Sequence, residues 1–333
     1  MAAPMMTPPP GAAPFLAAAG WAGAQILPLA GDASFRRYFR VIDGARRAVL
    51  MDAPPPHEDP RPFIAVGEWL DGHGFAAPRI LARDLDQGLL LLEDFGDARL
   101  REHLDTAPQD ELALYTRAVD LLVDLHRLPA QSGLAPYDRA VYQREAGLLT
   151  EWFAPAAGLD VDAAGYAAAW DAVLPIAEGD AAPAVTVMRD YHAENIMLLP
   201  DGTRSHGLGL LDFQDALAGH PAYDLVSLLQ DARRDVSPAV EQAMLAHYQS
   251  ATRVSSDFEA AYAVLGAQRN AKIIGIFTRL WQRDGKPRYL TFLPRMWGLL
   301  ERDLAHPALA PVAAWFAANI PAEARGALKA ETV

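Results

Sequence analysis

Hydrophobic and polar positions follow two different rhythms along the chain, and the change comes near residue 95. Before it, apolar and polar residues alternate in short runs, which is typical of half-buried strands. After it, apolar residues recur every three or four positions, which is typical of helices that bury one face. The pattern predicts an α+β fold with two lobes: a small β-rich N-lobe over residues 1–95 and a larger, mainly helical C-lobe over residues 96–333.

The first part is expected to form a small antiparallel sheet with one helix on it. From Ile26 the sequence reads as strand, loop, strand, turn and strand, because Asp43 and Gly44 between alternating segments are a strong hairpin signal. The run RPFIAVGEWLDGHG predicts a helix from residue 61 that stops at its glycines. RILARD and GLLLLEDF, joined by LDQG, predict a second hairpin. The first 20 residues read as an arm that leads into a short helix.

The second part is expected to be helical over residues 108–128, 141–153, 163–175 and most of 221–304. Its one β-like stretch lies between residues 184 and 213. There AVTVM, NIMLL and LGLLDF predict three short strands, and PDG predicts a turn between the second and the third.

This β-like stretch also concentrates charge, with five acidic residues between positions 188 and 216. Repulsion among carboxylates is usually offset by a metal ion, a proton or a cationic substrate. Asp190 precedes Asn195 by five positions, and Asp212 opens an Asp-Phe pair after the next strand. Kinases use this order to place a base for the attacking hydroxyl and oxygen ligands for Mg²⁺. The sequence therefore predicts phosphoryl transfer.

Two other uses of these residues are weaker. Asp and Asn are common turn residues, and either motif alone would more often be a loop than a catalyst. A metal site built on His192 and His206 lacks a third ligand at a suitable spacing. The two acidic motifs in order, each flanked by an apolar strand, favour catalysis over both alternatives.

The nucleotide phosphates are expected to meet the loop GDASFRRYF, residues 31–39, whose small residues let backbone N–H groups approach. No G-x-x-x-x-G-K-[ST] occurs, which excludes a P-loop enzyme. Kinases also place a Lys on the third strand, where this chain has Met51, and no Lys precedes residue 272. Either an arginine supplies the charge or Mg²⁺ and backbone donors suffice, and a pseudokinase is the alternative. The candidate arginines are Arg36, Arg37 and Arg40.

Composition narrows the partners. The chain has 333 residues and a net charge of −13, which argues against nucleic acid and anionic membranes. It has no Cys, which excludes disulfides and thiolate metal sites and suits a cytoplasmic protein. No apolar run of 18 residues predicts a membrane span, and the N-terminus lacks the charge pattern of a signal peptide. No obligate protein partner is evident; a small-molecule substrate is expected.

Nearly the whole chain resembles the aminoglycoside phosphotransferase/choline kinase superfamily, whose fold is bilobal and protein-kinase-like. The strings DASFRRYFR, VLMDAPPP, RPF, LDFQDA and IIGIFTRLWQRDGKPRYL most resemble the amino-sugar 1-kinases of bacterial cell-wall recycling. That resemblance implies ATP- and Mg²⁺-dependent phosphorylation of the anomeric hydroxyl of N-acetylmuramate and N-acetylglucosamine. The product would be the α-1-phosphate that feeds UDP-N-acetylmuramate synthesis.

The resemblance also implies roles for individual residues. Asp190 would be the catalytic base, and Asn195 and Asp212 the Mg²⁺ ligands. Residues 92–95 would be the hinge that presents backbone to adenine. Met188 is a departure, because relatives often have His there; it supports the loop rather than touching the γ-phosphate. The expected nucleotide contacts are Ser34, Phe35, Arg36, Arg37, Leu92, Glu93 and Phe95.

The acceptor site is expected to bind an anionic sugar. QRNAKIIGIFTRLWQRDGKPRYL, residues 268–290, gathers six cations against Asp284, and such an excess suits a carboxylate such as the lactyl group of N-acetylmuramate. For any single cation, a solvated helix face is the more common explanation. Asp215 either meets sugar hydroxyls or caps the following turn. The full set of expected sugar contacts is His192, Gln214, Asp215, Arg269, Lys272, Arg279 and Arg288.

Two other functions stay open at this stage. One is a different small-molecule kinase of the superfamily, acting on an aminoglycoside, choline or homoserine. The other is a nucleotide-binding pseudokinase that regulates a partner.

Overall fold

The computed structural model describes residues 6–29, 35–178, 184–200, 204–326 and 328. The expected PDG turn falls largely outside these residues, as do residues 31–34 of the nucleotide loop. The chain forms two compact units, one of Met1–Pro108 with Glu194–Asp215 and one of Gln109–Ala193 with Ala216–Val333. This grouping differs from a single cut after residue 95, which stays a prediction.

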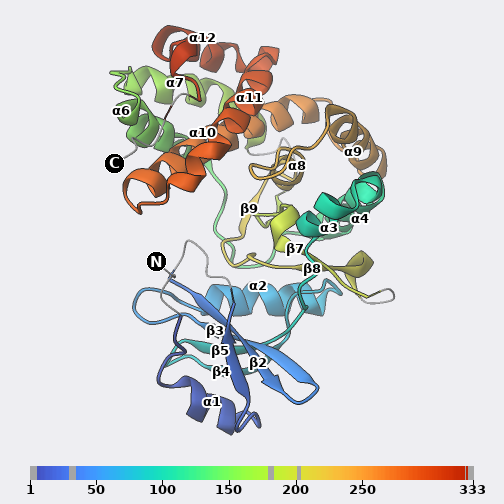
Figure 1. The fold of residues 1–333 in the computed structure, drawn as a ribbon. Helices are drawn as coiled ribbons and strands as arrows, with labels where there is room; N and C mark the ends of the chain where they lie inside the picture. Colours follow the sequence, from blue (N-terminus) through green and yellow to red (C-terminus); the bar gives the residue numbers. More distant parts are fainter. Residues whose placement is uncertain (1–5, 30–34, 179–183, 201–203, 327, 329–333) are drawn as a thin grey trace. The chain divides into compact units, whose positions relative to one another are not determined.

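The first unit is built on a five-stranded antiparallel sheet with strand order β1-β2-β3-β5-β4 (Figure 1). Asp43 pairs with Arg46 across a tight turn in which Gly44 has φ +59°, as the hairpin signal predicts. Both predicted hairpins are therefore confirmed. The strands are β1 (Gln25–Pro28), β2 (Arg37–Asp43), β3 (Arg46–Asp52), β4 (Ile80–Asp84) and β5 (Leu89–Glu93).

Helices and a second hairpin complete this unit. α1 (Ala12–Ala18) buries Phe15 and Leu16 in a cluster with β2, β3 and β5 residues, and α2 (Arg61–Gly72) buries an apolar face that includes Phe63. α3 (Leu100–Thr106) was not predicted from the sequence. The hairpin of β7 (Ile196–Leu198) and β8 (Leu208–Leu210) joins the unit through backbone hydrogen bonds, including one of 2.8 Å from Leu210 N to Ala76 O.

The second unit is mainly helical, as predicted, and within its described residues a small sheet pairs β6 (Val185–Val187) with β9 (Leu217–Gly219). β9 was not predicted, because three residues leave almost no periodic signal. Its helices are α4 (Glu111–His126), α5 (Arg139–Ala146), α6 (Ala154–Ala156), α7 (Ala163–Val173), α8 (Ala222–Leu229), α9 (Pro238–Ala251), α10 (Phe258–Gln282), α11 (Leu293–Leu304) and α12 (Ala310–Asn319).

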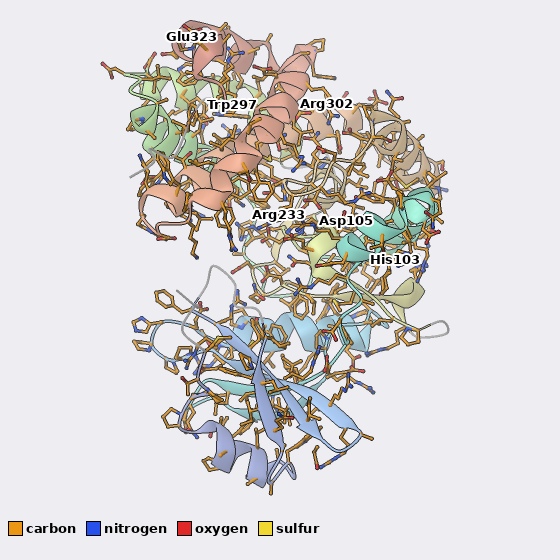
Figure 2. The ribbon with its side chains drawn as sticks, in the orientation of Figure 1. His103, Asp105, Arg233, Trp297, Arg302 and Glu323 are labelled. Atoms are coloured by element: carbon orange, nitrogen blue, oxygen red, sulfur yellow. The ribbon has the colours of Figure 1, made fainter. Side chains whose placement is uncertain are left out.

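The long helix α10 is the centre of this unit, and it packs against α5, α8 and α11 (Figure 1). Gly275 permits the close approach of the segment between α5 and residue 149, since a Cβ there would lie 2.3 Å from the backbone of Leu148. Trp297 lies on α11 (Figure 2). Its ring packs against those of Phe153 and Phe316 at centroid distances of 5.0 and 6.0 Å. None of the helices in the described ranges combines the length and apolar character that crossing a bilayer requires.

Short turns of other helix types connect these elements. They are 3₁₀ turns η1 (Pro108–Asp110), η3 (Leu174–Ala177), η5 (Ala193–Asn195), η6 (Ser205–Gly207), η7 (Pro287–Phe292), η8 (Pro307–Leu309) and η9 (Ala322–Ala324), and a π turn η2 (Leu149–Phe153).

Candidate active site

Asp190 lies in the loop after β6. Side chains of α8 hold the backbone of that loop through hydrogen bonds. Arg189 adopts φ +68°, a conformation that side chains other than Gly rarely take and that surrounding contacts must enforce. Asp224 accepts hydrogen bonds from the backbone N–H groups of Met188 at 2.7 Å and Arg189 at 2.8 Å. Ser227 Oγ donates to Arg189 O at 3.0 Å. α8 thus fixes the peptide groups that precede Asp190.

A buried carboxylate on α5, Glu145, organises the charged side chains beside this loop. It forms ion pairs with Arg189 and with Lys272 Nζ, the latter at 3.0 Å, and it accepts a hydrogen bond from the Tyr137 hydroxyl. Burial raises the pKa of Glu145, but Lys272 and Arg189 attract its negative charge and bring the pKa below its ordinary value. Sequence reasoning missed Glu145. The available signal was its position three residues after Tyr142, on the face of the helix that becomes buried.

Asp190 itself is half-buried and stays ionised. Burial acts to raise its pKa, but the attraction of Lys272, Arg269 and Arg189 is larger, so the pKa of Asp190 lies below its ordinary value. An ionised carboxylate at neutral pH can accept a proton, which is what the role predicted for Asp190 requires.

His192, predicted to contact the sugar, lies buried in the loop. Its Nε2 is 3.2 Å from Arg233 Nη1, and burial lowers the pKa of His192 to about 4, so the ring is neutral at physiological pH. The next residue is also fixed, because Ala193 N donates to Asp231 Oδ2 at 3.3 Å. These contacts give His192 a part in holding the loop; its contact with a sugar stays a prediction.

The four cations predicted to bind the sugar carboxylate fall into two groups. Lys272 is committed to Glu145, and Arg269 is 4% exposed and donates to Ser227 Oγ at 3.0 Å. Arg279, in the last turn of α10, is half-buried, and within the described residues its Nε has no hydrogen-bond partner. Arg288 is exposed, with its guanidinium 5.2 Å from the ring centroid of the adjacent Tyr289.

In the other unit, Asp212 follows β8 in a left-handed conformation, φ +59°. Asn195 Nδ2 is 3.4 Å from one carboxylate oxygen of Asp212, and Gln214 Nε2 donates to the other at 2.9 Å. The neighbouring Phe213 is fully buried and stacks on Phe63 of α2 at 4.9 Å. Phe213 therefore anchors the turn that presents Asp212 beside Asn195.

This pair fits Mg²⁺ shared with a phosphate. Magnesium is usually held by one or two carboxylates together with substrate phosphates and waters rather than by a closed protein cage. Asp212 offers a carboxylate and Asn195 an amide oxygen, and they lie side by side. Among the described residues, no cluster of three or more His, Asp or Glu could hold a metal ion.

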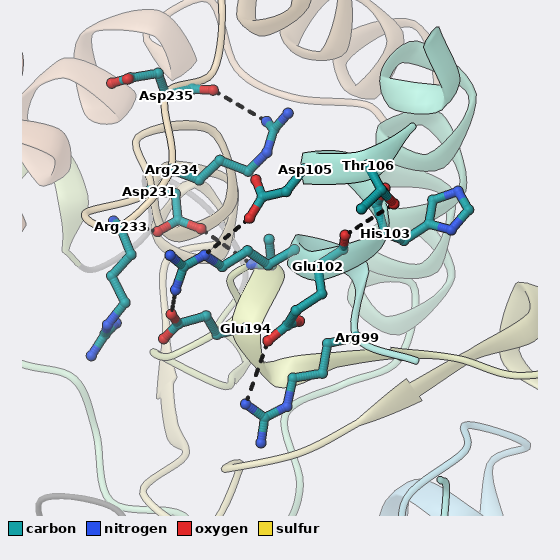
Figure 3. Close-up of polar contacts among 12 residues, drawn as sticks. Arg99, Glu102, His103, Asp105, Thr106, Glu194, Asp231, Arg233, Arg234 and Asp235 are labelled. Carbon is teal, nitrogen blue, oxygen red and sulfur yellow. Dashed lines mark hydrogen bonds and ion pairs between the residues drawn. The ribbon is translucent and has the colours of Figure 1, made fainter. Parts of the chain in front are cut away.

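The segment that carries Asn195 is tied to α3. Arg101 forms an ion pair with Glu194, the residue before Asn195, and its Nε lies 3.9 Å from Asp105 Oδ2 (Figure 3). Sequence reasoning missed Arg101, since nothing in the local pattern marks a partner so distant along the chain.

Of the expected nucleotide loop, the structure describes residues 35–39, and Ser34 lies outside the described part. Phe35 is 66% exposed and stacks on His57 at 5.2 Å. Arg36 places Nη2 3.7 Å from Asp212 Oδ1, whereas Arg37 Nε donates to Asp52 Oδ2 at 2.8 Å. Arg36 is thus the loop arginine that lies beside the predicted metal ligand.

The expected hinge begins at the end of β5. Leu92 is buried, and Glu93 N donates to Arg79 O at 2.8 Å, so this amide already has a partner. The Phe95 ring lies directly on Gly209 of β8, where a Cβ would come within 2.7 Å of it. Only glycine leaves room for the ring in this place.

Comparisons with known proteins agree with this architecture. The model of the phosphotransferase enzyme family matches residues 25–263. The N-acetylmuramate/N-acetylglucosamine kinase of Caulobacter vibrioides is 39% identical, with 94% of this chain and 97% of that protein covered. The protein of the same name from Pseudomonas aeruginosa is 40% identical, with 88% and 89% covered.

Solved structures show the same fold at low sequence identity. A choline/ethanolamine kinase family protein from Mesorhizobium loti has a TM-score of 0.61 at 14% identity, covering 92% of this chain and 95% of that one. The gentamicin–APH(2″)-IIa complex has a TM-score of 0.62 at 13% identity, covering 92% and 100%. The expected α+β, kinase-like fold with two lobes is confirmed, as is the resemblance drawn from the sequence motifs.

Proposed function

The chain belongs to the phosphotransferase enzyme family, and we propose that it phosphorylates the anomeric hydroxyl of N-acetylmuramate and N-acetylglucosamine with ATP. The product would be the α-1-phosphate, made in the cytoplasm during peptidoglycan recycling toward UDP-N-acetylmuramate. The observation that carries the reaction type is Asp190, a half-buried carboxylate beside Lys272 and Arg269, which keep it ionised. The substrate class is supported by the names of relatives that are 39 and 40% identical.

In the proposed reaction, Asp190 accepts the proton of the anomeric hydroxyl as its oxygen attacks the γ-phosphorus. The new O–P bond forms, the bond to the β-phosphate oxygen breaks, and ADP leaves with the electron pair. Asn195 and Asp212 would hold Mg²⁺, which neutralises phosphate charge when bound. Lys272 and Arg189 contribute by holding the charge of Asp190 and the shape of its loop.

The nucleotide would be held by the first unit. In this proposal, adenine binds the backbone of residues 92–95. The Glu93 N–H already donates to Arg79 O. The Glu93 carbonyl and the Phe95 N–H are therefore the groups that would bind adenine. The phosphates would meet the loop around Ser34, Phe35, Arg36 and Arg37.

For the sugar carboxylate, the structure favours Arg279 and Arg288 over Lys272 and Arg269, because the latter two already have buried partners. Gln214 donates to Asp212, and its Nε2 lies 3.3 Å from Asp215 Oδ2. A contact between these two residues and sugar hydroxyls stays part of the proposal.

ADP release with a panel of acceptors tests the function. The panel contains both amino sugars, an aminoglycoside, choline, homoserine and a blank without acceptor, each with ATP and Mg²⁺. We expect release with the two sugars, and ³¹P NMR of the product should show a phosphate coupled to the anomeric proton. Faster release with another acceptor would contradict the proposed substrate, and nucleotide binding without release would indicate a pseudokinase.

The variant Asp190→Asn tests whether Asp190 is the general base. Removing a general base should lower kcat by at least about 10²-fold while ATP still binds. Turnover near that of the unchanged protein would remove Asp190 from its role.

A further inference from the structure

The segment between β5 and α3 pairs with β7 along the backbone, and both belong to the first unit. Leu198 N donates to Ala98 O at 2.7 Å, and Arg99 forms an antiparallel bridge with Met197. α3 begins at the next residue, Leu100. The first turn of this helix is therefore held beside the start of β7, the strand that follows the predicted metal ligand Asn195 directly.

A contact between side chains extends this pairing to the residue before Asn195. Arg101 of α3 forms an ion pair with Glu194, which is 93 positions further along the chain. The two side chains are 32% and 21% exposed, so water shields their attraction only in part. The ion pair thus acts on the backbone one residue before Asn195.

The segment that leads into α3 is itself fixed to the sheet. Arg40 of β2 donates to Asp97 Oδ2 at 3.0 Å and to Asp94 Oδ1 at 3.2 Å. This guanidinium, one of the three considered from the sequence for the nucleotide phosphates, holds the segment after β5. α3 therefore starts from a backbone that the sheet holds on one side and β7 on the other.

The backbone of Asn195 is also held from β8. Leu211 N donates to Asn195 O at 2.9 Å, and the next residue is Asp212, whose carboxylate lies 3.4 Å from the Asn195 amide. Magnesium requires a near-ideal octahedron of ligands at about 2.0–2.1 Å. A small displacement of Asn195 relative to Asp212 would therefore weaken a shared metal site.

We infer that Arg101 is a positioning residue for this metal site, and that through Glu194 it holds Asn195 where the amide oxygen can share Mg²⁺ with Asp212. Arg101 itself touches neither the metal nor the nucleotide. The inference rests on the proposed function, because it assumes that Asn195 and Asp212 hold the metal that accompanies the nucleotide.

Position and charge predict opposite effects when Arg101 is removed. The substitution Arg101→Met takes away a cation near the metal site, which by charge alone would strengthen the binding of a metal ion. If Arg101 acts by holding Glu194, the same substitution weakens metal binding. The sign of the change therefore separates the two explanations.

Binding of Mn²⁺ in the presence of ADP and without sugar, followed by electron paramagnetic resonance, tests the inference. Mn²⁺ prefers the same oxygen ligands as Mg²⁺, and ADP without protein is the blank. We expect Arg101→Met to weaken Mn²⁺ binding roughly 10-fold, the lower end for loss of a group that orients a metal ligand. Calorimetric titration of ADP in EDTA should show unchanged affinity. The variant should fold, because partly exposed ion pairs contribute little to stability.

Arg99→Met is the matched control. Arg99 is 44% exposed, and its Nη1 lies 3.9 Å from Glu102 of the same helix (Figure 3). Its substitution removes the same charge and leaves the Arg101–Glu194 ion pair intact, so it should not weaken Mn²⁺ binding. Arg101→Lys should keep part of the affinity that Arg101→Met loses.

Glu194→Gln tests the ion pair from its other side and decides the question if Arg101→Met does not fold. Its control is Asp105→Asn, which removes a negative charge beside Arg101 and leaves the ion pair. Glu194→Gln should weaken Mn²⁺ binding and Asp105→Asn should not. The double variant of Arg101→Met with Glu194→Gln should be as weak as Arg101→Met alone, since both changes break one contact.

The inference is overturned if Arg101→Met binds Mn²⁺ as tightly as the unchanged protein or more tightly. It is also overturned if the double variant regains full affinity, because the effect would then be one of charge. Weaker ADP binding in EDTA would show a general disturbance of the unit and would count against the inference as well. An unchanged protein that binds no more Mn²⁺ than the ADP blank would refute the proposed metal ligands, and the role of Arg101 with them.

Discussion

The half-buried Asp190 keeps its charge through a cation that it shares with a second carboxylate. Lys272 is the largest attraction acting on Asp190, and the same ammonium group lies 3.0 Å from Glu145. Arg189 shares Glu145, so loss of Lys272 would not leave that carboxylate alone. A substitution of Lys272 can therefore test its effect on Asp190 while the buried carboxylate of Glu145 keeps Arg189 as an ion-pair partner.

Changing Lys272 should move the pH dependence of the reaction. The pKa of Asp190 is lowered, so the ionised base persists until the pH falls through that lowered value. In Lys272→Met the pKa of Asp190 should rise, and the acid limb of kcat/KM should shift to higher pH. Lys272→Arg should keep the limb in place. A loss that is equal at every pH would show that Lys272 serves only the fold.

The basic segment around the end of α10 should discriminate between the two sugars. Arg279→Ala and Arg288→Ala should reduce kcat/KM for N-acetylmuramate far more than for N-acetylglucosamine, which has no carboxylate. A charge-assisted hydrogen bond is worth about 1.5–3 kcal/mol, or roughly 10- to 150-fold. Lys272→Ala and Arg269→Ala should reduce kcat/KM for both sugars to a similar extent, because both cations lie beside Asp190. Equal losses in all four variants would place the carboxylate elsewhere.

At the scale of elements, α2 controls the position of Asp212 through Phe213. The Phe213 ring stacks on Phe63, and a Cβ at Gly67 would lie 3.3 Å from it. Such a distance is tighter than ordinary van der Waals contact, so a side chain at Gly67 must push the ring. Any shift of Phe213 is passed to Asp212 by the backbone.

A pair of glycines in α2 tests this coupling. Gly67→Val should raise the Mg²⁺ concentration needed for half-maximal activity several-fold, because it displaces Phe213 and with it a metal ligand. Gly72→Val adds the same side chain to the same helix where no atom lies within 4 Å, and it should leave the Mg²⁺ requirement unchanged. An identical response of the two variants in Mg²⁺ titrations would contradict the coupling.

The elements with strong periodicity could be predicted from the sequence. The helix expected over residues 108–128 is α4, Glu111–His126, and the Asp43–Gly44 turn joins β2 to β3. β9 could not be predicted, since its three residues are strand only because β6 pairs with them. A local pattern identifies an element whose own residues have a clear hydrophobic periodicity. It misses an element that forms only because a segment distant in the sequence pairs with it.

The residues of the candidate site also fall into those that local spacing identifies and those that only the fold brings together. The spacing of Asp190, Asn195 and Asp212 is local and could be read from the sequence, although their roles stay predictions. Glu145 and Lys272 are far apart along the chain, and only the packing of α5 against α10 brings them together. No single sequence reveals such a contact.

At the scale of the whole molecule, the chain leaves its first unit after Pro108 and returns at Glu194 to add the β7–β8 hairpin. The five-stranded sheet is complete before the departure, but the hairpin brings Phe213 to α2 and pairs Leu198 N with Ala98 O at 2.7 Å. The first unit therefore depends on residues that come about a hundred positions later.

A fragment of residues 1–108 should consequently fail to fold cooperatively, although it contains the entire sheet. Burying a Phe side chain contributes about 1.5–3 kcal/mol, a large share of the stability of a small domain. Thermal unfolding followed by circular dichroism would check this, with residues 194–215 joined to the fragment through a Gly/Ser linker as the control. A sharp transition in the unjoined fragment would contradict the expectation.

The late return of the hairpin also matters while the protein is being made. Synthesis proceeds at about 5–20 residues per second, so roughly 5–20 s pass between the emergence of the sheet and that of Phe213. Throughout this interval the apolar face of α2 lacks the ring that will cover it. The speed of the ribosome through the second hundred codons thus decides how long the nascent chain exposes a surface that invites aggregation or chaperone binding.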